Sequence, residues 1–337
     1  MSSLNPRALA AINRFRSYKP PPFALWDALP VRKRAAVLVL LFADRWGDLR
    51  VVVTMRAATL RNFSGHAALP GGKADSESET PYQIARREAF EEIGLPMDDS
   101  RIPRPFRIEQ LCCLPPAMAR THVVVTPCVA FLHADAASAS ASDERSRSRS
   151  RPRPGGATGA RDSDDDPPPL VEDSMIPRLD AREVAAVFSA PFYNFLKQED
   201  LPARPGETHP PGRWYDGTWI GWEGVRWRTH NFYVPVNNQR VSKPRRRSSA
   251  AQRELADKVE AAAAAEEEEA EQKGELDGGR FRVWGMTGRV LLDAARIAFG
   301  EEPEMEHCEA LGDGDVIKRV AARGVFDEVG EPKDAKI

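Results

Sequence analysis

The chain has 337 residues, and 42% of them are hydrophobic, which suits one good-sized domain or two small ones. Its formal net charge of −2 gives no overall attraction to nucleic acid or membrane, and no apolar run is long enough for a membrane span. The four cysteines lack metal-ligand spacing, which favours a reduced compartment over secretion.

The first 31 residues are predicted to be an N-terminal extension. Four basic residues precede the first acidic one, Asp27. Leu9, Ile12 and Phe15 are spaced to share one face of a helix that ends before the prolines at 20–22. A short surface helix and a mitochondrial transit peptide both fit this pattern.

The apolar patterns that follow predict a sheet with helices. The segment 32–56 reads as a β-hairpin around Gly47-Asp48, and 81–93 reads as a helix. Further elements are expected in chain order as strands at 106–114 and 123–132, a strand entering a short helix at 183–196, strands at 224–234 and 281–285, and an amphipathic helix at 286–299. This order predicts one layered α/β (α+β) domain over 32–300, followed by a C-terminal tail at 301–337.

Two low-complexity insertions are predicted to interrupt the domain. Residues 134–169 are mostly Ser, Arg, Asp, Pro and Gly, and they have almost no apolar side chains to offset the entropy of ordering. Deleting 138–168 should therefore leave stability and turnover nearly unchanged. Residues 242–279 begin basic and continue rich in Ala and Glu, which is typical of a solvated helix or tether.

The helix predicted at 81–93 carries an unusual set of charges. Thr80 is a suitable N-cap, Pro81 suits the first helical position and Gly94 ends the helix. Glu88 has Glu91 and Glu92 as its i+3 and i+4 neighbours, so three carboxylates share one face. Such a cluster favours a hard divalent cation, although a solvated acidic face would be the usual explanation for a shorter match.

The longer pattern resembles the Nudix box of the Nudix hydrolases. It consists of a glycine, a glutamate, an Arg-Glu pair, a Glu-Glu pair and a final glycine, at positions Gly72, Glu79, Arg87, Glu88, Glu91, Glu92 and Gly94. Two departures are a six-residue rather than five-residue spacing before Glu79 and Ala89 at an aliphatic position. The resemblance implies a Nudix α/β/α sandwich with a mixed sheet, and a loop and helix that hold Mg²⁺ or Mn²⁺ against a diphosphate.

The same resemblance implies roles for individual residues. Glu88 and Glu92 correspond to the principal metal ligands, with Glu91 as a further ligand or the group that activates water, and the Gly72 carbonyl as another ligand. Arg87 corresponds to a residue that orients a carboxylate, either Glu79 or Glu91.

The upstream residues resemble the motif of the coenzyme A diphosphatase branch of that family. They read Thr54, Arg56-Ala57, Arg61, Gly65 and Leu69-Pro70-Gly71-Gly72 in the motif's spacing, with Leu69 in place of Phe. This implies hydrolysis of coenzyme A, its disulfide or acyl-coenzyme A, with Arg56, Arg61 and Gly71 at the substrate. Guanidinium groups suit these substrates because they match phosphate oxygens bidentately.

Two other functions are also compatible with the sequence. The enzyme could instead be a Nudix pyrophosphatase for oxidised nucleotides or NADH. The arginine-rich run at 144–153 could mark an RNA-associated scaffold on a Nudix frame, although nearby acidic residues make nucleic acid an unlikely partner.

Several single residues also have two interpretations. Glu183 could be a base near the metal or a rim charge, and His66 a substrate contact or a loop histidine. Cys112 and Cys113 are expected in the core. The tryptophans at 214, 219, 222 and 227 could stack on adenine, but packing is the default.

The last three residues, Ala335-Lys336-Ile337, resemble a peroxisomal address. We therefore expect a peroxisomal import receptor as a partner and the peroxisome as the location, with the mitochondrion or cytosol as alternatives.

Overall fold

The computed structural model describes residues 4–56, 66–134, 170–175, 184–239, 241 and 279–327. Its larger sheet is mixed, because β1 and β7 are parallel while the other strand pairs are antiparallel. The central order is β3-β2-β1-β7-β5, with β4 on β1, β6 on β7 and β8 on β2. These strands are β1 (Arg34–Ala43), β2 (Leu49–Arg56), β3 (Ala67–Ala68), β4 (Gly71–Lys73), β5 (Phe106–Cys113), β6 (Ala117–Met118), β7 (Val124–Ala134) and β8 (Val184–Pro191).

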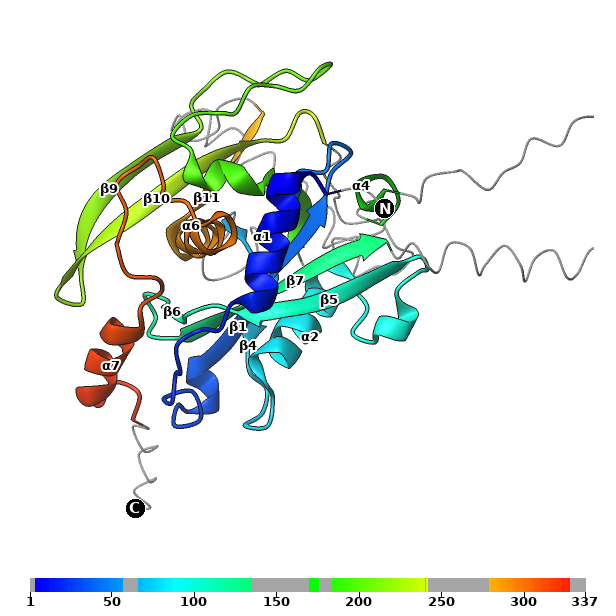
Figure 1. Ribbon diagram of the computed structural model, residues 1–337. Coiled ribbons are helices and arrows are strands. Elements are labelled where there is room, and N and C mark those ends of the chain that lie inside the picture. Colours follow the sequence, from blue (N-terminus) through cyan, green and yellow to red (C-terminus); the bar gives the residue numbers. More distant parts are fainter. Residues whose placement is uncertain are drawn as a thin grey trace, which may run out of the picture.

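Helices cover both faces of this sheet (Figure 1). On one face α2 (Pro81–Ile93) buries Ile84, Ala85 and Ala89 against the residues of β1 that point that way. On the other face lie α1 (Pro6–Ser17) and α6 (Gly285–Phe299), which contact each other and share a core cluster. The expected α/β/α sandwich with a mixed sheet is confirmed.

A second sheet lies on the outer side of α6 (Figure 1). It is antiparallel and contains β9 (Tyr215–Trp222), β10 (Val225–Pro235) and β11 (Arg280–Trp284), in the order β11-β10-β9. The side of this sheet that faces α6 contributes Tyr215, Phe232 and Val283 to the core. The sequence predicted β10 and β11 but not β9.

The remaining short elements connect these layers. They are the 3-10 helices η1 (Val31–Lys33), η2 (Asp99–Arg101) and η4 (Phe192–Leu196), and the helices α4 (Val171–Ser174) and α7 (Gly314–Ala322). Helix α7 packs Val316, Ile317 and Val320 against a small cluster that includes Met118 of β6. Within the described residues, no helix is long and apolar enough to cross a membrane.

Most predicted elements occur where the pattern put them. The hairpin is formed by β1 and β2, and its turn places Gly47 at a positive φ of 78°. Cys112 is buried in β5, as expected of a core cysteine, whereas Cys113 is only half-buried and packs at the edge of the core. The two predicted insertions lie outside the described residues except for Ala134 and Gly279, as do residues 335–337.

The prediction for the N-terminal helix was partly wrong. Helix α1 does end before the prolines, but its buried face consists of Ala8, Ala11, Ile12 and Phe15, while Leu9 is 46% exposed. Small alanines allow α1 to lie close to α6, so the buried face is centred on them and not on Leu9.

Candidate active site

The helix α2 begins and ends as its sequence requires. Thr80 and Gln83 form a reciprocal capping box, Pro81 occupies the first helical position and Gly94 takes the left-handed conformation at the C-cap. These local signals fix the start of the helix directly after the loop from β4. The carboxylates of α2 are thereby presented to the backbone of Gly71 and Gly72.

Gly71 and Gly72 of β4 lie against both β1 and helix α2. A Cβ at Gly71 would lie 2.3 Å from the Ala36 carbonyl oxygen, and a Cβ at Gly72 would lie 2.3 Å from Oε1 of Glu88. The Gly71 N–H also donates to Oε2 of Glu92 at 3.2 Å. Two glutamates from adjacent turns of α2 therefore reach the same two glycines of β4, which have no side chains to keep them away.

Arg87 holds the neighbouring acidic groups in place. Its guanidinium donates to Glu79 and to Glu88, both at 2.9 Å, and to the Lys73 carbonyl at 2.8 Å. Glu91 lies 3.6 Å from the same group and exposes 42% of its side chain, compared with 18% for Glu79 and Glu88. Glu91 is thus the glutamate of this group that solvent reaches most easily, and Asp75, 3.3 Å from Arg87, is more exposed still.

The pKa values of the two less exposed glutamates shift in opposite directions. The hydrogen bond from Arg87 lowers the pKa of Glu79, whereas burial raises the pKa of Glu88 despite its bond to Arg87. Glu88 consequently lacks full compensation for its negative charge. A cation beside it would supply that compensation.

The donor set fits a hard divalent ion. In the part of the chain that the structure describes, no three His, Cys, Asp or Glu side chains converge into a preformed metal site. Glu88 and Glu92 nevertheless meet at Gly71–Gly72 of β4, and carboxylate and carbonyl oxygens are the ligands that Mg²⁺ and Mn²⁺ prefer.

The upstream motif is only partly described. Arg56 ends β2, and its backbone N–H donates to the His66 carbonyl at 3.0 Å. Its Nε is buried and has no hydrogen-bond partner among the described residues. Arg61 and Glu183 lie outside those residues, so their predicted roles stay predictions.

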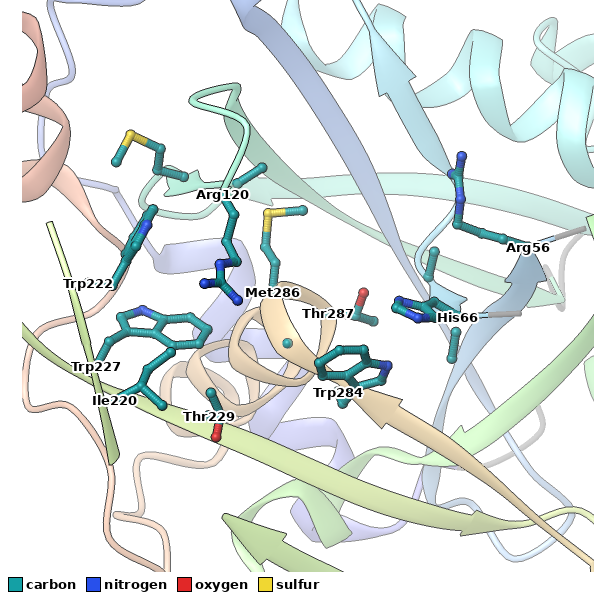
Figure 2. A pocket seen from close by; sticks show the side chains of 15 residues that line it. Arg56, His66, Arg120, Ile220, Trp222, Trp227, Thr229, Trp284, Met286 and Thr287 are labelled. Carbon is teal, nitrogen blue, oxygen red and sulfur yellow. The ribbon is translucent and has the colours of Figure 1, made fainter. Parts of the chain in front are cut away.

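A cavity of about 330 Å³ opens beside Arg56, between β3, the turn after β6, β10 and the first turn of α6 (Figure 2). We call it the tryptophan pocket. Its lining includes Arg56, His66, Arg120, Trp222, Trp227 and Trp284. Figure 2 shows Arg56 and His66 at one end and Arg120, Trp222 and Trp227 toward the other.

Of the four tryptophans considered in the sequence, two line this pocket and two do not. Trp214 is a core residue, as the default predicted, with 1% exposure, and Trp219 pairs with Glu306 outside the pocket. Trp222 and Trp227 line the pocket instead. Arg120 gave no signal, because it stands in a turn without a recognisable motif.

Comparison with known proteins points to one family. The NUDIX domain model matches residues 32–111. The chain is 28% identical over 318 residues to Peroxisomal coenzyme A diphosphatase 1 of Saccharomyces cerevisiae, covering 90% of this chain and 80% of that protein. It is 32% identical over 277 residues to Nudix hydrolase 15, mitochondrial, of Arabidopsis thaliana, covering 82% of this chain and 62% of that protein. It is 33% identical over 121 residues to an uncharacterized Nudix hydrolase NudL of Klebsiella aerogenes, covering 36% of this chain and 90% of that protein.

Proposed function

Because the chain belongs to the Nudix hydrolase family, we propose that this enzyme hydrolyses the diphosphate bond of coenzyme A and its derivatives. The products would be 4′-phosphopantetheine and adenosine 3′,5′-bisphosphate. The observation that carries the proposal is the place of Arg56, whose buried Nε has no partner among the described residues. Arg56 ends the strand that pairs with β3, and β3 comes just before Gly71–Gly72 in the chain. The similarity to a coenzyme A diphosphatase over most of both chains supports the same substrate class.

The residues of the site have two roles in this proposal, metal binding and the positioning of carboxylates. Glu88 and Glu92, with Glu91 and the Gly72 carbonyl, would hold Mg²⁺ or Mn²⁺. Such an ion, when bound, neutralises diphosphate oxygens and lowers the pKa of a coordinated water. Arg87 fixes Glu79 and Glu88 by direct hydrogen bonds.

Glu91 is the carboxylate of α2 best placed to take a proton from water, because it is the most exposed glutamate that Arg87 contacts. The water oxygen would bond to phosphorus while the bridging P–O bond breaks, and the leaving phosphate would retain the bonding electrons. Arg56 and Arg61 would bind phosphate oxygens of the substrate, and Gly71 would let the backbone approach the diphosphate.

A product assay tests the reaction. The full chain would be given coenzyme A, its disulfide, acyl-coenzyme A, NADH or 8-oxo-dGTP with Mg²⁺ or Mn²⁺, and the products identified by mass spectrometry. We expect coenzyme A or one of its derivatives to have the highest kcat/KM and to yield the two products above. Brisk hydrolysis of NADH or 8-oxo-dGTP beside inactive coenzyme A would reject the proposal in favour of a nucleotide pyrophosphatase.

We also propose that the enzyme works in the peroxisome. The relative from Saccharomyces cerevisiae is named as peroxisomal, whereas the one from Arabidopsis thaliana is named as mitochondrial. A fluorescent protein fused to the N-terminus should enter peroxisomes through the import receptor, and the same fusion without residues 335–337 should not. A mitochondrial or diffuse signal from the full-length fusion would contradict this location.

A further inference from the structure

We propose that the tryptophan pocket binds the adenosine 3′-phosphate half of the substrate, and that Arg120 contacts the 3′-phosphate. This inference rests on the proposed function, because it concerns which half of coenzyme A the pocket accepts. The substrate has two very different halves on either side of its diphosphate. One half is an aromatic base with a charged phosphate, and the other is a flexible, uncharged pantetheine arm.

The positive charges of two arginines favour the phosphate-bearing half of coenzyme A over the pantetheine half. Arg56 and Arg120 both line the pocket, and neither side chain has a hydrogen bond or ion pair with another described residue. Arg120 is exposed and Arg56 is half-buried, so water solvates both side chains until a ligand covers them. A ligand that removes this water without bringing an anion leaves the cations uncompensated, which is unfavourable. Pantetheine would bring no anion to Arg120, whereas the adenosine 3′-phosphate half supplies phosphate oxygens.

The walls suit a flat heteroaromatic ring. Trp222 and Trp227 meet edge to face with their ring centroids 6.0 Å apart, and the Trp284 ring lies 4.7 Å from His66. In Figure 2 the Arg120 guanidinium points to the space between Trp227 and Met286. A base on the indole surfaces would therefore place an attached phosphate within the reach of Arg120.

The pocket is also connected directly to the diphosphate site. Ala68 lines it and is only three residues before Gly71, a span of at most about 10 Å even in a fully extended chain. Met286 lines it as well and packs on the cluster of Ala35, Val123 and Val125, as does Val37, which pairs with Gly71. A ligand whose diphosphate lies at Gly71–Gly72 thus has the pocket beside it.

The N-terminus of α6 adds to the attraction for an anion. Gly285, Met286 and Thr287 form its first turn and line the pocket, and Trp284 provides no side-chain cap for their N–H groups. Free N–H groups and the helix dipole favour negative charge at this end. The same first turn would favour phosphate over a neutral amide.

The kinetic test uses Arg120→Gln with coenzyme A and dephospho-coenzyme A, which differ only in the 3′-phosphate. We expect kcat/KM to fall about ten- to a hundredfold with coenzyme A and by less than about threefold with dephospho-coenzyme A. Arg120→Lys, which keeps the charge, should recover part of the loss. The matched control is Arg226→Gln, since Arg226 is exposed, lies 4.8 Å over Trp219 and does not line the pocket.

A binding measurement separates this inference from the proposed reaction. The full chain is titrated with adenosine 3′,5′-bisphosphate and with AMP, and tryptophan fluorescence or calorimetry gives each Kd. We expect the bisphosphate to bind at least about tenfold more tightly, and Arg120→Gln to abolish that preference. Preserved preference in an enzyme that fails to cut coenzyme A would reject the reaction but support the pocket.

Other outcomes would overturn the assignment. Equal losses with both substrates in Arg120→Gln, or no loss with either, would show that Arg120 does not contact the 3′-phosphate. Equal binding of the bisphosphate and AMP to the unmodified chain would do the same. A changed preference for acyl-chain length in Arg120→Gln, with the 3′-phosphate preference intact, would assign the pocket to the pantetheine half.

Discussion

Two neighbouring glycines at the candidate active site serve different purposes, although the sequence motif treats them as one unit. Neither has a positive φ, so backbone freedom does not explain them. Gly71 is needed because its Cα lies against the backbone of β1, and Gly72 because it lies against the carboxylate of Glu88. A side chain at position 71 would meet rigid backbone, whereas one at position 72 would meet the end of the flexible Glu88 side chain.

Substitution of each glycine by alanine should therefore give opposite results. Gly71→Ala should lower stability by about 1–3 kcal/mol or more, because the new Cβ meets the backbone of Ala36 and Val37. Gly72→Ala should change stability little but lower kcat about a hundredfold or more, because the carboxylate of Glu88 must move away from residue 72. Urea unfolding and steady-state kinetics on both variants measure the two effects. Similar losses of stability in both variants would refute this distinction.

The metal assignment of Glu88 and Glu92 has its own test. Glu88→Gln and Glu92→Gln keep the shape of each side chain but remove its charge, so turnover should fall by orders of magnitude. Melting temperature should not fall in Glu88→Gln, because burial already makes its charge unfavourable and raises its pKa. Glu77→Gln, an exposed carboxylate in the same loop, is the control. Near-normal turnover of either variant at saturating Mg²⁺ would contradict the assignment.

At the residue scale, the sequence predicted those contacts that follow from the spacing of residues within one loop and one helix. Glu79, Arg87 and Glu88 are held together by a loop and one helix, so their separation along the chain determines their contacts. Arg120 and Trp227 come together only through the packing of β10 and α6 beside the turn after β6. Spacing along the chain contains no information about that meeting.

At the scale of elements, the β1–β2 hairpin shows how a turn is fixed by one buried carboxylate. Oδ1 of Asp44 accepts the N–H groups of Trp46 and Asp48, both at 2.9 Å. Burial raises the pKa of Asp44 from its ordinary value of 3.8 to about 6, in spite of these bonds and the nearby Arg50. The folded state therefore holds this proton more tightly than the unfolded state, and Asp44 lowers stability as pH rises from about 4 to 6.

Asp44→Asn should remove that pH dependence. An asparagine Oδ1 can keep both hydrogen bonds without a charge, so the variant should be more stable than the natural protein by about 1–3 kcal/mol at pH 8. At pH 4 the difference should largely disappear, because the natural carboxyl is then mostly protonated in the folded state. Urea unfolding at both pH values measures it. A variant that is less stable at pH 8 would show that the ionised form is favoured.

Elements were predictable where their apolar pattern is regular. The segment of β1 is continuously apolar and α6 is amphipathic, and both were placed correctly. Strand β9 was missed because Gly217 and Gly221 interrupt its pattern and most of its residues are only half-buried. It is stabilised by pairing with β10 rather than by its own propensity.

At the scale of the whole molecule, the C-terminal part of the chain supports a wall of the tryptophan pocket. Asp313, just before α7, accepts the backbone N–H of Met118 at 2.9 Å, and Arg289 of α6 lies 3.9 Å from the same carboxylate. Ile317 of α7 is fully buried in the cluster that contains Met118. Helix α7 thereby fixes β6, and the turn after β6 carries Arg120.

Loosening α7 should consequently affect substrate binding at a distance. Ile317→Ala should cost about 2–5 kcal/mol of stability because it leaves a cavity in this cluster. At a temperature where the variant stays folded, KM for coenzyme A should rise several-fold while kcat changes less, since Glu88 and Glu92 belong to α2, whose buried residues lie in a different core cluster from Ile317. Lys318→Ala is the control, because Lys318 is exposed and pairs with Asp315 at the surface. If Ile317→Ala loses stability but keeps the KM of the natural protein, α7 supports the fold without positioning the pocket.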